Sequence, residues 1–506
     1  MKLAYTIVCR GSWLSLAQVE LFKKKLQSLN PEIILHTVIK ETKGDKEQST
    51  PLHLLEGKDF FTAEIQDELR TGAADFAVHS MKDVSGELFF GNSFYRVIDR
   101  DDIRDVAIFN DSIIRKISAG LPITIGTSSP RRTAMATEFL KKALPKLHEQ
   151  DIQINALPIR GNVDTRLKKL TESGQYDGII LAVAGLNRLL NYAPAKETVQ
   201  QLLKGKRLMF LPLFECPPAA GQGAIVAETN LDNQDAIDLL EKISNEQQNL
   251  AIIEERKYAN KYGFGCSRPF GVFHYDGANT HFTFATGLAQ DEKPFTEWNF
   301  DRPILPENAV VFSGSDYMRS FYSESFLKHT KIDNSSNALF ITSHKALHSE
   351  ALVKQAQKKR IWCAGARTWS ALAKKGIWVE GSADGLGVAS IQSLLNSSLV
   401  NLCNNEFCMV TNNNSVVGWL SEGWKAVASY TLHPQLDQEL VAKIASADFI
   451  FWASFQQYQA AGQYATKNVQ HACPSGKTAK LLLEQGLKPI IFPTIKAFQA
   501  WRTSIS

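Results

Sequence analysis

The chain has 506 residues, of which 44% are hydrophobic and 21% are charged, and its formal net charge is +4. This composition is typical of a globular protein, and the length predicts about three to four domains. Because the net charge is close to neutral, a broad electrostatic field for nucleic acid is excluded, and any anion binding must come from local clusters.

The seven cysteines are scattered and show no metal-ligand spacing. Single thiols of this kind fit a reducing compartment. The N-terminal apolar run, residues 3–9, ends at Arg10 without a cleavage-type segment, and no apolar run is long enough to span a bilayer. We therefore expect a cytoplasmic protein that is a monomer and has no metal, no nucleic-acid partner and no membrane contact.

The first hundred residues predict alternating strands and helices. The expected elements are strands at 4–9, 33–40 and 75–80 and helices at 14–28 and 60–70. The strand at 75–80 delivers Lys82 and Asp83 at its carboxyl end, which is where open α/β sheets bind ligands. A candidate site therefore begins at these two residues.

A second unit starts near Asp99 and repeats this alternation. We expect strands at 123–125, 152–154, 157–159 and 177–187, with a helix after the first of them and another after residue 166. Residues 126–132 form a small-residue turn between a strand and a helix, an arrangement that binds anions through free backbone N–H groups. The alternation predicts an α/β fold with mostly parallel sheets.

One cysteine lies in a turn rich in glycine and proline. Cys266 is flanked by Gly263 and Gly271, after a helical stretch at 233–262 and before alternating residues at 272–298 that predict a small antiparallel sheet. Such a thiol is either a small buried residue in a tight corner or an accessible group that holds a ligand covalently. The surrounding residues decide between these interpretations.

The last 200 residues carry a weak internal repeat. Residues 340–343 recur at 451–454, and residues 363–368 recur at 473–478, both with a spacing of about 110 residues. The stretch at 301–306 before them has the composition of a linker. The repeat predicts two similar α/β halves.

Cationic and hydroxyl side chains gather at the predicted strand ends of the first two units, together with one carboxylate. They are Arg10, Ser12, Lys82, Asp83, Ser128, Ser129, Arg131, Arg132, Arg160, Arg166 and Arg188. Guanidinium groups bind carboxylates through paired hydrogen bonds, and the chain has no phosphate-loop or dinucleotide fingerprint, so a substrate with many carboxylates fits best. Asp83 then stabilises a developing cation or moves a proton. The alternatives are a helix-capping Asp83 and a Lys82 that forms a Schiff base.

Five motifs follow one another along residues 1–300. They are H-S-M-K-D-V at 79–84, G-T-S-S-P-R-R at 126–132, R-G-N-V-D-T-R at 160–166, I-I-L-A-V-A-G-L-N-R at 179–188 and G-C-S-R-P-F-G at 265–271. In this order they resemble hydroxymethylbilane synthases, also called porphobilinogen deaminases. The resemblance implies that four porphobilinogens are joined head to tail with loss of ammonia, on a dipyrromethane cofactor thioether-linked to Cys266.

The resemblance also implies roles for individual residues. Asp83 stabilises cationic intermediates and assists proton transfer. The implied cofactor-binding residues are Cys266, Lys82, Asp83, Ser128, Ser129, Arg131, Arg132 and Arg160. The implied substrate-binding residues are Arg10, Ser12, Arg160, Arg166 and Arg188, with Lys58 and Phe61 in the active-site loop. The sequence departs from the family at Leu54, Asp59 and Ser85, which leaves the loop contacts open.

The C-terminal region resembles uroporphyrinogen-III synthases, which have two α/β halves and cyclise hydroxymethylbilane. By this resemblance Tyr430 acts on the leaving hydroxyl, while Thr342, Ser343, Ser454 and Thr478 bind propionates. The alternative for this region is a degenerate binding or scaffold module. The alternative for the first half is a solute-binding protein for a polyanion.

Together these resemblances imply an α/β architecture. Two domains like type II periplasmic binding proteins precede a small α+β cofactor domain, and a two-lobed α/β region follows. The expected boundaries are 1–98 with 205–230 for domain 1, 99–204 for domain 2, 231–300 for the cofactor domain, 301–307 for a linker and 308–506 for the last region.

Overall fold

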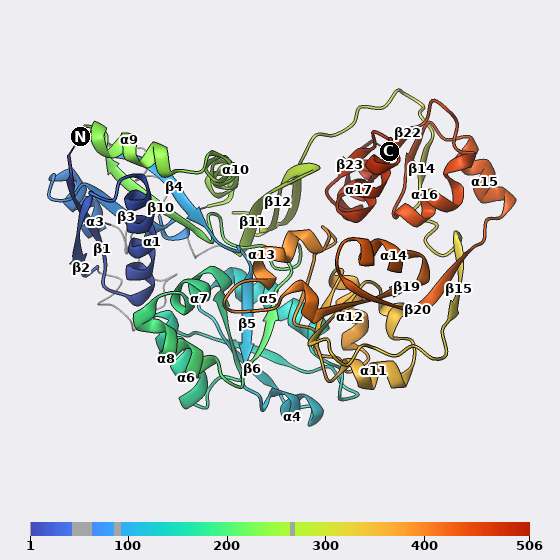
Figure 1. Cartoon of the computed structure of the whole chain (residues 1–506), viewed down its shortest axis with the longest axis horizontal. Coiled ribbons are helices and arrows are strands. Elements are labelled where there is room, and N and C mark those ends of the chain that lie inside the picture. Colours follow the sequence, from blue (N-terminus) through green and yellow to red (C-terminus); the bar gives the residue numbers. More distant parts are fainter. Residues whose placement is uncertain (1, 43–62, 85–92, 264–268, 506) are drawn as a thin grey trace. The chain divides into compact units, whose positions relative to one another are not determined.

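The computed structural model describes residues 2–42, 63–84, 93–263 and 269–505 (Figure 1). The protein is a mixed α/β protein with two compact units. The first unit comprises Met1–His274, Phe284–Glu297 and Ser397–Val400, and the second comprises Tyr275–Thr283, Trp298–Asn396 and Asn401–Ser506. Within the described residues, every helix is too short or too polar to cross a membrane.

The first sheet has the strand order β2-β1-β3-β10-β4. Its strands are β1 (Ala4–Arg10), β2 (Ile34–Lys40), β3 (Phe76–Ser80), β4 (Ser93–Arg100) and β10 (Ala224–Asn230). All run in one direction except β10, which is antiparallel to both of its neighbours. The accompanying helices are α1 (Trp13–Leu29), α3 (Ala63–Arg70) and α9 (Gln234–Ile243).

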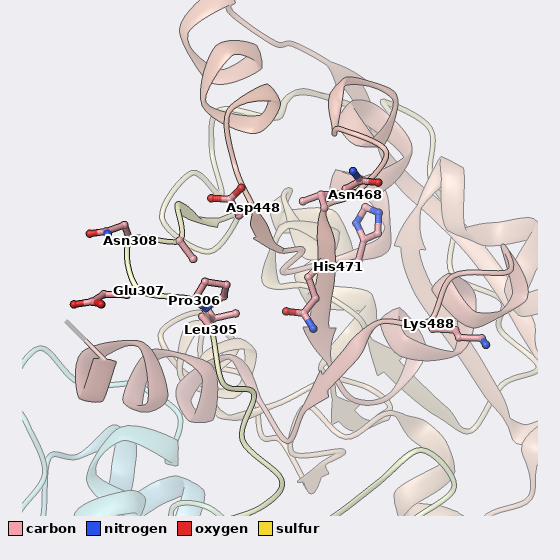
Figure 2. A pocket seen from close by; sticks show the side chains of 11 residues that line it. Leu305, Pro306, Glu307, Asn308, Asp448, Asn468, His471 and Lys488 are labelled. Carbon is pink, nitrogen blue, oxygen red and sulfur yellow. The ribbon is translucent and has the colours of Figure 1, made fainter.

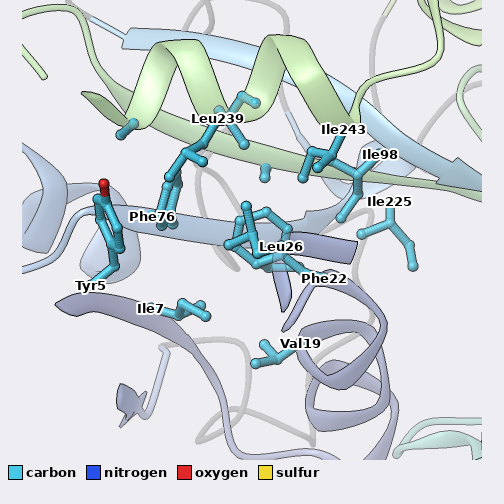
Figure 3. Close-up of a cluster of buried hydrophobic side chains, with 14 of the residues drawn as sticks. Tyr5, Ile7, Val19, Phe22, Leu26, Phe76, Ile98, Ile225, Leu239 and Ile243 are labelled. Atoms are coloured by element: carbon cyan, nitrogen blue, oxygen red, sulfur yellow. The ribbon is translucent and has the colours of Figure 1, made fainter. Parts of the chain in front are cut away.

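The core of this sheet is a cluster of buried aliphatic and aromatic side chains (Figure 3). Phe22 and Leu26 from α1 pack there with Phe76 from β3 and with Leu239 from α9, and all four side chains are fully buried. Removing such side chains from water is the main stabilising term of folding. The cluster therefore holds β3 in place, and β3 carries the candidate acid at its end.

The second sheet repeats this pattern with the order β7-β6-β8-β5-β9. Its strands are β5 (Asp105–Phe109), β6 (Ile123–Gly126), β7 (Ile154–Leu157), β8 (Gly178–Ala182) and β9 (Arg207–Phe210). Here β5 is the one reversed strand, antiparallel to β8 and β9. The helices are α4 (Ile113–Ser118), α5 (Pro130–Ala143), α6 (Val163–Glu172), α7 (Val183–Leu190) and α8 (Ala193–Leu203).

Two expectations for this region need correction. The predicted strand at 177–187 ends at Ala182, and Val183–Leu190 form the buried helix α7. A continuous apolar run does not distinguish a buried strand from a buried helix, which is why the pattern was misleading. In addition, β9 pairs with β5, so the chain is still in the second sheet beyond residue 205. We therefore propose that it returns to the first domain between β9 and β10.

Residues 234–299 complete the first half of the chain with two helices and a small sheet. The predicted helix at 233–262 is two helices, α9 and α10 (Glu246–Tyr262), because Asn245 starts a new helix by accepting a hydrogen bond from the Gln248 backbone N–H at 3.0 Å. Next come β11 (Phe270–Gly277), β12 (Thr280–Leu288) and β13 (Pro294–Asn299), which form a three-stranded sheet in that order.

The second unit contains two sheets. One has the order β14-β21-β22-β23 and is parallel throughout, with strands Val311–Ser313, Phe449–Phe451, Gln470–Pro474 and Ile490–Phe492. The other has the order β15-β20-β19-β16-β17-β18, with strands Tyr322–Phe326, Lys425–Pro434, Phe407–Asn412, Ala338–Ile341, Arg360–Cys363 and Gly381–Ser382. In this six-stranded sheet β15 is antiparallel to its neighbour β20, and all other neighbouring strands are parallel.

The helices of the second unit follow the predicted repeat. They are α11 (Glu350–Ala356), α12 (Ala366–Ala373), α13 (Gln392–Leu395), α14 (Asn413–Ser421), α15 (Gln438–Ala445), α16 (Phe455–Ala461), α17 (Lys477–Glu484) and α18 (Ile495–Ile505). In both copies a strand, β17 or β22, ends in a glycine turn and starts a helix of eight residues, α12 or α17. Gly376 and Gly486 follow these helices with φ of 71° and 80°, a left-handed backbone that favours glycine.

Candidate functional site

Asp83 lies immediately after the end of β3. Residues Met81–Asp83 form one turn of 3-10 helix, and the Asp83 side chain is half-buried. Gly221 packs against this turn with a φ of +74°, so closely that a Cβ atom there would lie 2.5 Å from Cγ of Met81. Only glycine combines this backbone angle with this approach. The turn that carries Asp83 is therefore fixed from one side by residue 221.

Arg131 and Arg132 occupy the first turn of α5 and are both buried. Both donate to the carboxylate of Asp105, which is fully buried at the start of β5. The Arg131 Nη2 and Arg132 Nη2 atoms are each 2.8 Å from an Asp105 oxygen, and Arg132 Nε is 3.1 Å away. Asp105 is thus a central residue of the site, and the sequence analysis missed it.

The charges of this cluster do not cancel. Burial alone raises the pKa of the Asp105 carboxyl, but the charges and hydrogen bonds of Arg131 and Arg132 outweigh burial and hold the pKa well below its usual range. Asp105 therefore stays ionised at neutral pH. Two guanidinium groups against one carboxylate leave an excess of one positive charge, which suits a ligand with carboxylate groups.

The turn at residues 220–223 connects Asp83 to the arginines. Its Gly221 contacts the Met81 side chain, as described above, and the Gln222 Nε2 atom donates to Asp105 at 2.9 Å. The carbonyl oxygen of Gly223 accepts a hydrogen bond from Arg188. Three predicted parts of the site therefore meet at one turn.

Glu255 on α10 anchors this turn to the rest of the first half. Its carboxylate is fully buried and accepts from Arg100 Nη2 at 2.7 Å, from the Gly221 backbone N–H at 2.8 Å and from the His274 backbone N–H at 2.9 Å. A buried carboxylate is tolerated when it is paired and hydrogen-bonded in this way. Glu255 was also missed, because it lies in a charged helical stretch that looks solvent-exposed in the sequence.

Arg188 is buried on α7 and is not at a strand end as predicted. Burial lowers its pKa, and the carboxylates of Asp99 and Asp101 act in the opposite direction. Its Nη2 atom is 3.7 Å from an Asp99 oxygen. Within the described residues its Nε atom has no hydrogen-bond partner. This side chain is held among carboxylates and retains one polar atom for another contact.

The predicted serines of the first half have structural hydrogen bonds. Ser12 and Ser129 are the N-caps of α1 and α5. Ser128 Oγ donates to the Ile159 carbonyl at 2.8 Å and accepts from the Ile159 N–H at 3.0 Å. These hydroxyls shape the helix starts, so an anion there would meet backbone N–H groups first.

The remaining arginines of the set lie at or near helix starts. Arg10 is the last residue of β1 and lies two residues before Ser12, the α1 N-cap. Arg160 precedes α6, and Arg166 on α6 donates through Nε to the Gly161 carbonyl at 2.7 Å. This bond fixes the base of the Arg166 guanidinium.

A second cluster of candidate residues lies in the six-stranded sheet of the second unit. Thr342 and Ser343 follow β16, while Thr411 and Asn412 end the parallel neighbour β19. Thr342 Oγ1 donates to the Val410 carbonyl at 3.2 Å and lies 3.0 Å from Thr411 Oγ1. The carboxyl ends of parallel strands are the usual ligand-binding edge of such a sheet.

Tyr430 on β20 is the register partner of Asn412 and is buried. Burial raises the pKa of its phenol, and hydrogen bonding from Asn412 and Ser343 acts against that rise without cancelling it. The phenol is therefore protonated at neutral pH and can act as a proton donor. The structure thus brings Ser343, Asn412 and Tyr430 together.

The last two predicted residues belong to the other sheet of the second unit. Ser454 is the N-cap of α16, and Thr478 lies in the first turn of α17. Both helices contact α14, which begins directly after Asn412. Gln456 donates to Ser415 at 3.0 Å, and the Lys477 ammonium lies 3.4 Å from the centre of the Trp419 ring.

Comparison with known proteins gives the family of the first half. Residues 5–238 match the family model described as "Porphobilinogen deaminase, dipyromethane cofactor binding domain". The porphobilinogen deaminase of Lachnospira eligens is 35% identical over 270 residues, which are 53% of this chain and 83% of that protein. The chain belongs to the porphobilinogen deaminase family. The enzyme of Brevibacillus brevis is 36% identical over 283 residues, 55% of this chain and 82% of that protein.

A solved structure is similar to part of the chain. The uroporphyrinogen-III synthetase of Helicobacter pylori 26695 is 17% identical and covers 37% of this chain and 91% of its own, with a TM-score of 0.24. A likeness at this level carries no argument about fold or activity.

The deaminase family model is that of a dipyrromethane-binding domain, and the described residues fit such a group. The excess positive charge of Arg131 and Arg132 over Asp105 suits the carboxylates of a dipyrrole. The predicted attachment residue Cys266 lies outside the described residues, as do Lys58 and Phe61.

The second unit also contains a hollow of about 720 Å³ (Figure 2). It is lined by the segment 305–309, by Asp448, by residues 468–471 and by Lys488. His471 turns its Nδ1 atom away toward the Trp452 indole N–H, at 2.9 Å, and burial lowers its pKa. None of the predicted site residues is among those that line this hollow.

Proposed function

We propose that the first half of the chain is a porphobilinogen deaminase that joins four porphobilinogens head to tail and releases four molecules of ammonia. Family membership supports the reaction. The observation that carries the site assignment is the turn at residues 220–223, which joins the Asp83 turn to the Asp105 cluster. An acid and an excess of positive charge are thereby parts of one site.

In this proposal the chain's own residues have several tasks. Arg131 and Arg132, held by Asp105, bind carboxylates of the dipyrromethane, while Arg10, Ser12, Arg160, Arg166 and Arg188 bind acetate and propionate groups of the substrate. Lys82 also binds the cofactor, as do Ser128 and Ser129 near the start of α5. Cys266 is the proposed thioether attachment, and Lys58 and Phe61 are the proposed loop contacts.

Asp83 is the proposed catalytic carboxylate. As ammonia leaves porphobilinogen, positive charge develops on its pyrrole, and a carboxylate beside it lowers the energy of that state. When bound, the dipyrromethane supplies the pyrrole carbon to which the units are added. Asp83 would also help to take up the proton released when a unit is added.

The variant Asp83→Asn tests this role, because it keeps the shape of the side chain and removes its charge. We expect the rate of porphobilinogen consumption to fall about 10²–10⁴-fold while binding of porphobilinogen remains. Asp111→Asn, which removes a carboxylate at an exposed pair with Arg207, is the control and should keep the wild-type rate. Wild-type turnover by Asp83→Asn removes this residue from the chemistry.

For the C-terminal region we propose the next step, cyclisation of hydroxymethylbilane to uroporphyrinogen III. The observation that favours it is a protonated, buried phenol, Tyr430, beside Ser343 at the strand ends. Tyr430 would protonate the leaving hydroxyl, and Thr342, Ser343, Ser454 and Thr478 would bind propionates. A binding or scaffold module without activity is the alternative.

The porphyrin isomer obtained after oxidation separates these two alternatives. The purified chain incubated with porphobilinogen alone should give isomer III, and Tyr430→Phe should shift the product toward isomer I, which forms without a synthase. Isomer I from the wild-type chain would leave only the scaffold alternative.

A further inference from the structure

Asn412 has an unusual environment for an asparagine at the start of a helix. It ends β19 and is the N-cap residue of α14, yet its side chain makes no capping hydrogen bond. The residue is 6% exposed, and within the described residues its Oδ1 atom is buried without a hydrogen-bond partner. Buried polar atoms in native proteins are nearly always paired, so this oxygen needs an explanation.

Most other Asn and Asp caps of this chain make the capping bond, and Asn162, which does not, is exposed to solvent. Asn233 and Asn245 accept hydrogen bonds from backbone N–H groups at 3.2 Å and 3.0 Å, and Asp437 does so at 2.7 Å. An asparagine at an N-cap gains stability from that bond, and a buried acceptor without a donor loses stability. Asn412 makes no capping bond, and its buried oxygen has no donor within the described residues. Its carboxamide is held in this orientation by its surroundings against its own local preference.

The neighbouring hydroxyl groups make other contacts. Thr342 Oγ1 donates to the Val410 carbonyl or to Thr411 Oγ1. Ser343 Oγ accepts from the Lys345 N–H at 3.4 Å as the cap of the next 3-10 turn. Tyr430, the register partner of Asn412, brings a phenol to the same place. Within the described residues none of these hydroxyl groups donates to the Asn412 oxygen.

We propose that Asn412 is a substrate-binding residue of the C-terminal site, whose carboxamide oxygen accepts a hydrogen bond from an uncharged N–H group of the ligand. A neutral donor fits because the polar side chains named here, those of Thr342, Ser343, Thr411 and Tyr430, are uncharged. This inference rests on the proposed cyclisation, in which the ligand is a linear tetrapyrrole and the donors are its pyrrole N–H groups.

Such a contact would fix the pyrrole next to the phenol of Tyr430. Propionate-binding residues hold the ends of the ligand's side chains, but a ring N–H fixes the plane of the ring itself. Asn412 therefore determines which ring carbon lies near the proton donor. It binds the ligand, and Tyr430 remains the group that moves the proton.

The variant Asn412→Leu tests the proposal, because leucine has a similar shape and no acceptor. If the oxygen serves a ligand, removing it relieves an unpaired buried group, and the melting temperature should stay the same or rise. At the same time the affinity for uroporphyrinogen III, used as the binding probe, should fall about tenfold, and the fraction of isomer III should drop through KM. Asn413→Ala, at the exposed next position, is the matched control and should change neither quantity.

Three results would overturn the proposal. Wild-type affinity and isomer III yield in Asn412→Leu would mean that the oxygen holds an ordered water only. A lower melting temperature together with lower activity would mean a structural role, and Asn412→Ala gives the same comparison if the leucine variant does not fold. Isomer I from the wild-type chain would rule out the proposed cyclisation and, with it, this inference. Failure of the cyclisation therefore shows in the wild-type chain, whereas failure of the Asn412 proposal alone shows only in the variant.

Discussion

The two candidate sites of this chain use opposite kinds of polar group. In the first half, Asp105, Arg131 and Arg132 form a buried cluster of full charges with an excess of one positive charge. In the second unit, Ser343, Asn412 and Tyr430 form a cluster of neutral groups at the ends of parallel strands.

Under the two proposed functions, the difference corresponds to what each site does. A site that assembles a chain of carboxylate-bearing rings needs fixed positive charge, and a buried counter-ion offsets the desolvation cost of that charge. A site that rearranges the finished chain can rely on hydrogen bonds and on a single proton donor. The charged site should therefore respond strongly to loss of one carboxylate, and the neutral site weakly to loss of one hydroxyl.

The largest effect is expected for Asp105→Asn. The variant leaves two buried guanidinium groups without their counter-ion, and we expect the free energy of unfolding to fall by about 3–5 kcal/mol. Denaturant titration measures it. Asp111→Asn removes an exposed carboxylate paired with Arg207 and should cost at most about 1 kcal/mol. Equal losses of unfolding free energy in the two variants would show that Asp105 contributes no more than an exposed ion pair.

The same carboxylate makes a pH-dependent contribution. The pKa of Asp105 is lower in the folded chain than its unfolded value of about 3.9, so its contribution to stability is complete above that pH. It is lost as the pH falls toward the folded pKa. The difference in melting temperature between wild type and Asp105→Asn should therefore shrink below about pH 4. A difference that stays constant from pH 7 to pH 3 would contradict this assignment.

A smaller effect is expected for Gly221→Ala, for which the chain offers a matched control. Gly221 and Gly205 have nearly the same φ, 74° and 72°, but only at Gly221 would a Cβ atom collide, 2.5 Å from Cγ of Met81. Gly205→Ala should cost about 1–2 kcal/mol for the backbone angle alone, and Gly221→Ala about 1–3 kcal/mol more.

Activity adds a second comparison between these glycine variants. Because the collision pushes on the turn that carries Asp83, only Gly221→Ala should also lower the rate of porphobilinogen consumption. Equal rates in both variants would mean that the turn at residues 220–223 does not position the acid.

The smallest effect is expected in the neutral cluster. Thr342→Val removes the hydroxyl that lies 3.0 Å from Thr411 Oγ1 and should lower the free energy of unfolding by about 1 kcal/mol. Denaturant titration again measures it, with Thr137→Val on the exposed face of α5 as the control. A loss as large as that of Asp105→Asn would contradict the distinction between the two sites.

Local signals in the sequence predicted much of the fold. The turn at 126–132 predicted a helix after it, and α5 is present but begins within that stretch, at Pro130 with Ser129 as the N-cap. The repeat predicted two similar α/β halves, and in both copies a strand, a glycine turn at Gly365 or Gly476 and a helix follow one another. These features depend on neighbours within a few residues, which the sequence shows directly.

Features that depend on distant partners could not be predicted. Asp105 lies in a run of alternating charges that resembles a solvated loop, and its partners are 26 and 27 residues away. The environment of Asn412 follows from its position opposite Tyr430, 18 residues later, across a bulge in the strand pairing. The apolar run around Val183 was assigned to a strand because burial on all sides removes the period that marks a helix.

The central claim is that the first half works on a dipyrrole tethered to Cys266, and the intact mass of the purified chain tests it most directly. We predict that the wild-type protein is heavier than its sequence by one covalent dipyrrole and that Cys266→Ser lacks the addition and the activity. An unmodified wild-type protein that consumes porphobilinogen at full rate would contradict the account.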